Sequence, residues 1–172
     1  MIQREIELAF LCNESIKWEG DPGVGKTAAL QAFFKKHNVV YHTLILSIHE
    51  PADVSGQPVM NMQEGTYRLA PPSWVKKLQA AAAQGFRTAL FLDELTTAPP
   101  SMQAAALRLV HERVVGDEKL PDDCWILAAS NPPEVAANGF ELSPPLANRF
   151  THLSHKFSAQ EWVMEFPTYW GD

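Results

Sequence analysis

The chain alternates between segments in which apolar residues recur with a helical period and short, continuous apolar runs. The helical period predicts helices over residues 1–12, 28–37, 73–84 and 99–110. The apolar runs predict strands over residues 15–19, 39–46, 88–92, 125–129 and 151–155. Such alternation is typical of an α/β fold with a mostly parallel sheet, and we expect the run 39–46 to be a buried strand of that sheet.

Residues 49–72 interrupt this pattern with closely spaced prolines and glycines. Within this excursion, residues 59–69 are predicted to form a hairpin. Long excursions from a compact domain are often functional. The side chains of Met60, Met62 and Tyr67 either contact a substrate at the tip of the hairpin or pack down on the body of the domain, and the sequence leaves both interpretations open.

Two further local patterns complete the prediction of elements. Residues 114–120 are predicted to form a short hairpin that turns at Gly116. Ser158 and Glu161 fit a capping box, so a last helix is predicted over residues 159–166.

The composition indicates one globular domain. The chain has 172 residues, of which 46% are hydrophobic, and this length suits one well-filled core. Its formal net charge of −6 argues against a surface that coats nucleic acid, so we do not expect nucleic acid as a partner. Neither a signal peptide nor an apolar run of about 18 residues is present. We therefore expect a cytoplasmic protein that makes no use of a membrane.

The clearest chemical signal is a glycine-rich segment between the first predicted strand and the second predicted helix. It fits G-x-x-x-x-G-K-[ST], the pattern of a phosphate-binding P-loop, whose glycines let backbone N–H groups converge on phosphate oxygens. Lys26 is expected to reach the β- and γ-phosphates, and the Thr27 hydroxyl is expected to hold Mg²⁺. The predicted nucleotide-binding residues are Gly20, Asp21, Pro22, Gly23, Val24, Gly25, Lys26, Thr27 and Ala28.

A second signal is the pair Asp93 and Glu94 at the end of the buried strand 88–92. Two carboxylates directly after such a strand must emerge at its carboxyl end, where ligands bind in open α/β sheets. Asp93 is predicted to hold Mg²⁺ together with Thr27, and Glu94 is predicted to orient or deprotonate the attacking water. The alternative is a pair of solvated carboxylates at a strand end.

Asn131 follows the strand 125–129 in the same way. An amide at the end of a strand beside the Asp93 strand could hydrogen-bond the γ-phosphate or the attacking water. This signal is weak by itself, because asparagine before proline is ordinary turn chemistry.

In order and approximate spacing, four segments resemble the core of an AAA+ ATPase over nearly the whole chain: residues 20–27, 90–94, 128–131 and 146–150. Within that superfamily the chain resembles the MoxR-like branch through residues 94–103, 130–132 and 147–150. The resemblance implies a P-loop NTPase fold, a three-layer αβα sandwich around a mostly parallel five-stranded sheet. It also implies Walker A at residues 20–27, Walker B at Asp93 and Glu94, and sensor 1 at Asn131.

The resemblance further implies a ring, usually a hexamer, in which Arg149 acts as an arginine finger on the ATP site of a neighbouring subunit. Arg113 is the competing candidate for that finger. ATP and Mg²⁺ are the implied ligands, and the ring would remodel or assemble a protein partner that the sequence does not identify.

Two features depart from the family pattern. Family members often have Asn-Arg where this chain has Thr96 and Thr97, so any role of that arginine is in doubt here. A helical lid normally follows the core, whereas this chain reaches Asp172 where the lid should start. We therefore expect residues 1–172 to be a single core domain without its lid, either as part of a longer protein or as an unconventional form.

Three functions fit these patterns. The leading hypothesis is a Mg²⁺-dependent ATPase. The second is a binding module in which ATP orders residues 49–72 for a partner without efficient turnover. The third is an AAA+ motor that acts on DNA, and the acidic net charge disfavours it.

Overall fold

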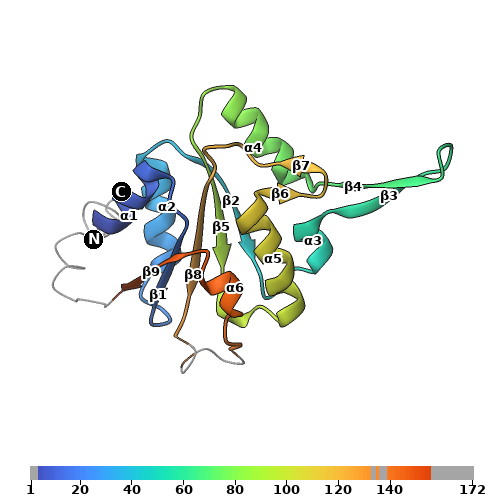
Figure 1. Cartoon of the computed structure of the whole chain (residues 1–172). Helices are drawn as coiled ribbons and strands as arrows, with labels where there is room; N and C mark the ends of the chain where they lie inside the picture. The colour runs from blue at the N-terminus through green and yellow to red at the C-terminus, as the bar shows by residue number, and fades with distance from the viewer. Residues whose placement is uncertain (1–3, 133–134, 136–138, 156–172) are drawn as a thin grey trace.

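A computed structural model of the chain describes residues 4–132, 135 and 139–155 (Figure 1). Its centre is a five-stranded parallel sheet in the order β2-β5-β8-β1-β9. The strands are β1 Ile16–Gly20, β2 Val40–Ile45, β5 Thr88–Asp93, β8 Trp125–Ser130 and β9 Thr151–His155. The predicted five-stranded parallel sheet is confirmed. The helix predicted over residues 159–166 lies outside the described residues.

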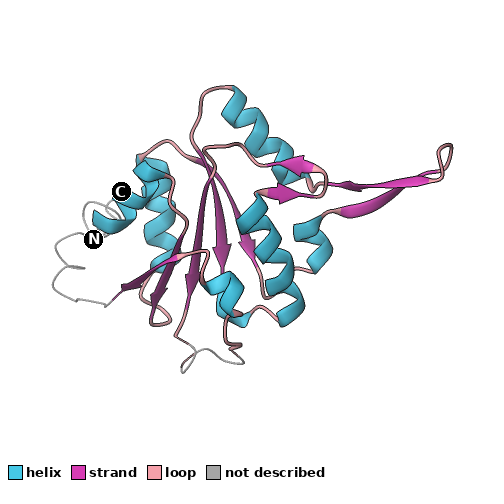
Figure 2. Cartoon of the chain, in the orientation of Figure 1, coloured by secondary structure: helices cyan, strands magenta, loops and turns pink. Residues whose placement is uncertain are grey.

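Helices cover both faces of the sheet, which gives the predicted three layers (Figure 2). One face packs against α1 and α2, and the other packs against α3, α4, α5 and α6. Their bounds are α1 Arg4–Cys12, α2 Lys26–Lys36, α3 Pro51–Ser55, α4 Ser73–Ala83, α5 Pro100–Glu112 and α6 Pro144–Ala147. None of the helices in the described part of the chain has the length and apolar character needed to cross a bilayer.

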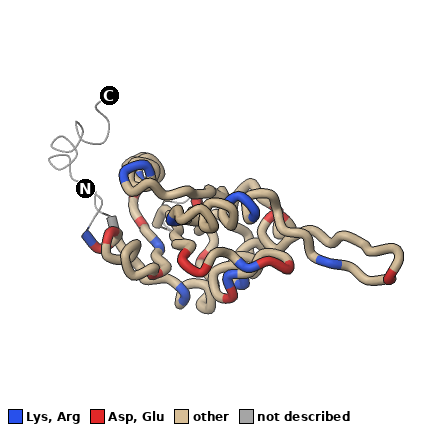
Figure 3. Tube along the Cα trace, turned by 90° about the horizontal axis from the view of Figure 1, so that it is seen from above, with Lys and Arg blue, Asp and Glu red and all other residues tan. Residues whose placement is uncertain are grey.

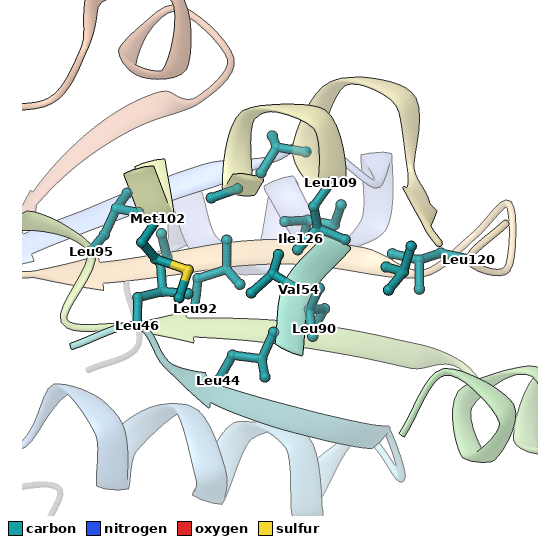
Figure 4. Close-up of a cluster of buried hydrophobic side chains, with 14 of the residues drawn as sticks. Leu44, Leu46, Val54, Leu90, Leu92, Leu95, Met102, Leu109, Leu120 and Ile126 are labelled. Carbon is teal, nitrogen blue, oxygen red and sulfur yellow. The ribbon is translucent and has the colours of Figure 1, made fainter. Parts of the chain in front are cut away.

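The apolar run of β5 explains how the two cores form. Ala89 and Phe91 point to the α1–α2 face, whereas Leu90 and Leu92 point to the opposite face, because successive strand residues alternate. The core on the face covered by α3–α6 gathers side chains from the sheet, from α3 and from α5, as Figure 4 shows. A strand buried on both faces fixes the position of the residues that follow it.

The strand β2 does not have the burial that we predicted from its apolar run. Among the described strands it pairs only with β5, so it is the outermost strand on that side of the sheet. Tyr41 and Ile45 are exposed along it, while Leu44 alone is fully buried. The prediction of a buried strand was wrong because periodicity reports apolar content and carries no information about the position of a strand in the sheet.

The predicted hairpin in residues 49–72 is present as β3 Gln57–Asn61 and β4 Thr66–Ala70, which project from the body as an arm (Figures 1 and 3). The exposed fractions of Met60, Met62 and Tyr67 are 66%, 85% and 68%. The interpretation that these side chains pack on the body is therefore wrong. Among residues 57–70, only Glu64 and Arg68 carry charge.

The base of the arm is held by the second predicted hairpin, β6 Val114–Val115 and β7 Glu118–Lys119. The backbone N–H of Asp117 donates to the Leu69 carbonyl at 3.0 Å, and the Leu69 N–H donates to Asp117 Oδ2 at 2.8 Å. The Gly116 N–H donates to the Ser55 carbonyl at 3.0 Å. The turn between β6 and β7 thus fixes where the arm leaves the body.

Substitution of Gly116 by Ala should destabilise this joint. Gly116 has φ of 62°, and a Cβ there would lie 2.4 Å from the Leu69 carbonyl oxygen. The left-handed backbone and the contact together should lower the free energy of unfolding by roughly 2–4 kcal/mol. Gly65, with φ of 63° and no atom within 4 Å of a Cβ, is the matched control. Gly65→Ala should lose only about 1–2 kcal/mol. If urea unfolding showed equal losses of stability for the two variants, the close contact between Gly116 and Leu69 would not be important for stability.

Candidate functional site

The candidate site lies where three neighbouring strands end. β8 lies between β5 and β1, so the residues that follow these strands meet at one edge of the sheet. The register aligns Leu92 with Ala128 and Ser130 with Glu19. This alignment brings the carboxyl ends of β1, β5 and β8 to the same side of the molecule (Figure 1). The P-loop, the acidic pair and Asn131 lie at these ends.

The P-loop connects β1 to α2 in the predicted way. Gly23 and Gly25 have φ of 78° and 82°, a conformation that is strained for residues with a Cβ. The helix begins at Lys26, and its first turn carries no acidic residue. The partly positive helix N-terminus therefore lies directly behind an exposed glycine loop, an arrangement suited to an anion.

Lys26 is buried and donates from Nζ to three oxygen atoms. The acceptors are the Gly20 carbonyl at 2.6 Å, the Asp21 carbonyl at 2.9 Å and Asn131 Oδ1 at 2.9 Å. Burial lowers the pKa of Lys26, while Asp93, Asp21 and Glu19 raise it in part. The ammonium group is therefore directed toward the space between the P-loop and the end of β8.

Thr27 and Asp93 form the second link across the strand ends. Thr27 Oγ1 donates to Asp93 Oδ2 at 3.0 Å, and the Glu94 N–H donates to Asp93 Oδ1 at 3.0 Å. Burial raises the pKa of Asp93, and these two hydrogen bonds act in the opposite direction. A hydroxyl and a carboxylate held this close are the oxygen donors that Mg²⁺ takes beside a bound phosphate, so these residues fit the metal.

Glu94 is exposed and has a backbone conformation that is rare for its residue type, with φ of 57° and ψ of 40°. Such strain is held by surrounding contacts and concentrates at functional sites. The Thr97 hydroxyl donates to the Glu94 carbonyl at 2.8 Å. The Ser47 hydroxyl donates to Glu94 Oε2. The Glu94 carboxylate is thus held at the surface of the site.

Sequence reasoning missed Ser47. It follows β2, whose end is aligned with the end of β5 through the pair Ile45 and Asp93. The signal was available, because a polar residue directly after a predicted strand falls at the edge where the other candidates lie.

The structure brings five predicted residues into one set of neighbouring groups: Lys26, Thr27, Asp93, Glu94 and Asn131. Arg149 lies outside this set, just after α6, and its exposed side chain makes no hydrogen bond or ion pair with the described residues. Arg113 lies at the amino ends of the strands. Its Nη2 donates to the carbonyl of Cys124, the residue before β8.

The helix α1 is also anchored at the amino ends of the strands. Arg87, before β5, donates to the Phe10 carbonyl at 2.9 Å, and Trp125, at the start of β8, donates to the Glu14 carbonyl at 2.8 Å. Glu7 lies 3.9 Å from His37 at the end of α2. These contacts anchor α1 where the strands begin, far from the P-loop.

Comparisons with known proteins agree with this geometry. A family model described as "ATPase family associated with various cellular activities (AAA)" matches residues 16–152. The chain is 29% identical over 143 residues to the acetoin dehydrogenase operon transcriptional activator AcoR of Bacillus subtilis (strain 168), covering 78% of this chain and 23% of that protein. Its fold resembles that of an ATPase candidate from Cytophaga hutchinsonii with a TM-score of 0.66 at 20% identity, covering 95% of this chain and 48% of that one.

The raised pKa of Asp93 predicts how Asp93→Asn changes stability. The folded protein binds the Asp93 proton more tightly than the unfolded chain, so this contribution to stability is lost as pH rises from 3.8 through the folded pKa. The amide oxygen can still accept from the Glu94 N–H, and the amide NH₂ can donate to Thr27 Oγ1, so both contacts remain without a buried charge. Asp93→Asn should therefore raise the unfolding temperature at pH 7 to 8, and the gain should shrink as pH falls toward 4. Asp122→Asn, at an exposed carboxylate, is the control and should show no gain. A lower unfolding temperature for Asp93→Asn throughout would contradict this account.

Proposed function

The chain belongs to the AAA family of ATPases, and from this premise we propose that it is the nucleotide-binding core of a Mg²⁺-dependent ATP hydrolase. The observation that carries the proposal is the link across three strand ends, in which Lys26 bonds to Asn131 and Thr27 bonds to Asp93. These are the groups needed to hold a triphosphate and its metal at one point. The chain spans about a quarter of its curated relative and about half of the similar solved structure, so the activity of the whole protein remains a proposal.

In this proposal the triphosphate binds at residues 20–28. Backbone N–H groups of the loop and of the first turn of α2 donate to phosphate oxygens. The Lys26 ammonium exchanges the Gly20 and Asp21 carbonyls for the β- and γ-phosphate oxygens. Both carbonyls belong to the P-loop, so the ammonium already lies at the loop that would hold the phosphates.

Thr27 and Asp93 would hold Mg²⁺, Thr27 by its hydroxyl and Asp93 by its carboxylate. When bound, the metal offsets the negative charge of the phosphates. Asp93 suits this role because its carboxylate is partly buried and is already oriented by the Glu94 N–H.

Glu94 is proposed to orient the attacking water and to take its proton. Ser47 follows β2, on the side of β5 away from β8 and β1, and the Glu94 carboxylate now accepts from its hydroxyl. Its bond to Ser47 must be exchanged for the water before the reaction. Asn131, which already contacts Lys26, is proposed to donate from its amide to the γ-phosphate or to the water.

Arg149 is proposed to act in a neighbouring subunit of a ring. Its guanidinium is exposed and makes no hydrogen bond or ion pair within the described residues, so it is available to a second chain. Arg113 is less suited, because its guanidinium is bonded to the Cys124 carbonyl at the opposite edge of the sheet. A hexameric, MoxR-like ring that remodels a protein partner is the form that we propose, with the exposed arm as a candidate contact for that partner.

A second candidate function is an ATPase module within a transcription regulator. It is favoured by the similarity to AcoR, a transcriptional activator. Both candidates place the same chemistry in this chain and differ in the partner.

Two substitutions separate nucleotide binding from hydrolysis. Lys26→Ala should weaken ATP binding at least about 100-fold, because the charged hydrogen bonds to phosphate are lost. Glu94→Gln should keep ATP affinity but lower turnover about 10²- to 10⁴-fold, because an amide takes no proton. Calorimetry measures the binding, and phosphate release measures the turnover. Hydrolysis at the wild-type rate by Glu94→Gln would exclude Glu94 as the base.

A subunit-mixing experiment tests Arg149. Arg149→Ala should bind ATP normally but hydrolyse it about 10³-fold more slowly. Mixing Arg149→Ala with Glu94→Gln should restore part of the turnover, because some interfaces then combine an intact Glu94 with an intact Arg149. Arg108→Ala, which removes an exposed arginine paired with Glu112, is the control and should leave turnover unchanged. A mixture that assembles by sizing chromatography yet stays inactive would rule out action across subunits.

A further inference from the structure

Thr96 occupies a short 3₁₀ helix, Leu95–Thr97, between β5 and α5. Its side chain and backbone are both engaged, and only 1% of the residue is exposed. Thr96 Oγ1 donates to the Asn131 carbonyl at 3.1 Å, and the Thr96 carbonyl accepts the Phe140 N–H at 2.7 Å. Thr96 therefore joins the turn after β5 to the segment that follows β8.

Beyond the end of β8, this contact holds the carbonyl of Asn131. The ladder between β8 and β1 ends at the pair Ser130 and Glu19, so Asn131 lies beyond the last paired residue. Pro132 follows and has no N–H to donate. The hydroxyl of Ser130 is buried without a hydrogen-bond partner, so it does not hold this segment either. The hydroxyl of Thr96 is the hydrogen-bond donor that the structure gives to the Asn131 carbonyl.

Thr96 and the adjacent Thr97 each donate to the backbone carbonyl of a candidate site residue. Thr97 donates to the Glu94 carbonyl, and Thr96 donates to the Asn131 carbonyl. The distance from Asn131 Oδ1 to Lys26 Nζ is 2.9 Å, so a shift of the Asn131 backbone would also change the position of its amide relative to the ammonium.

We propose that Thr96 is a positioning residue that fixes the Asn131 amide beside Lys26, so that both groups meet the γ-phosphate together. This inference rests on the proposed ATPase function. Only 1% of Thr96 is exposed, so its side chain would act through Asn131 rather than by contact with the nucleotide. A hydrogen bond of this kind is worth only about 1 kcal/mol to stability, but a misplacement of about 1 Å at a reacting group can slow a reaction about 100-fold.

The test replaces Thr96 by valine, which keeps the shape of the side chain and removes the hydroxyl. Thr96→Val should lower kcat for ATP about 10- to 100-fold and leave the Kd for ATP within about 2-fold. Thr96→Ser keeps the hydroxyl and should retain most of the activity. Thr88→Val removes a hydroxyl from a buried threonine at the opposite end of β5 and should leave kcat unchanged.

A double-mutant cycle with Asn131→Ala distinguishes positioning from a general loss of structure. If Thr96 acts through Asn131, Thr96→Val should cause no further loss of kcat in the Asn131→Ala protein. Additive losses, or a Thr96→Val protein as active as wild type, would overturn the role of Thr96 while leaving the ATPase proposal intact. A wild-type chain that binds ATP and never hydrolyses it, in any assembly, would overturn both.

Discussion

The fold brings the carboxyl ends of three adjacent strands together, and two hydrogen bonds tie those ends: Lys26 to Asn131 and Thr27 to Asp93. Each group is partly or fully withdrawn from water, and a withdrawn charge must be compensated by partners. Burial lowers the pKa of Lys26 and raises the pKa of Asp93, so both charged forms are held at a cost. A phosphate–metal pair between them would supply the missing counter-charges.

The amino ends and the carboxyl ends of the strands have different roles. At the amino ends of the strands, Trp125 donates to the Glu14 carbonyl just after α1, and the Arg113 guanidinium donates to the Cys124 carbonyl. At the carboxyl ends, polar groups and the strained backbone of Glu94 remain at the surface. The contacts at the amino ends belong to the framework of the fold, whereas the groups at the carboxyl ends are the ones that a ligand can reach.

Most of the fold followed from the sequence because its strands are strongly apolar and its glycines mark the turns. The candidate residues of the site were also predicted from the sequence, because Lys26 and Thr27 belong to the glycine-rich motif and Asp93 and Asn131 closely follow predicted strands. Ser47 and Thr96 did not, because their importance comes from contacts across strands that only the register creates. The edge position of β2 was missed for the same reason: the order of strands in a sheet is a tertiary property that local patterns do not contain.

The most direct test of the central claim is calorimetric titration of the chain with a non-hydrolysable ATP analogue, with Mg²⁺ and then with EDTA. The account predicts one bound nucleotide per chain and a clearly weaker affinity once the metal is chelated, because Thr27 and Asp93 contribute through the metal. An affinity that is the same with and without Mg²⁺, or no binding at millimolar analogue, would contradict it.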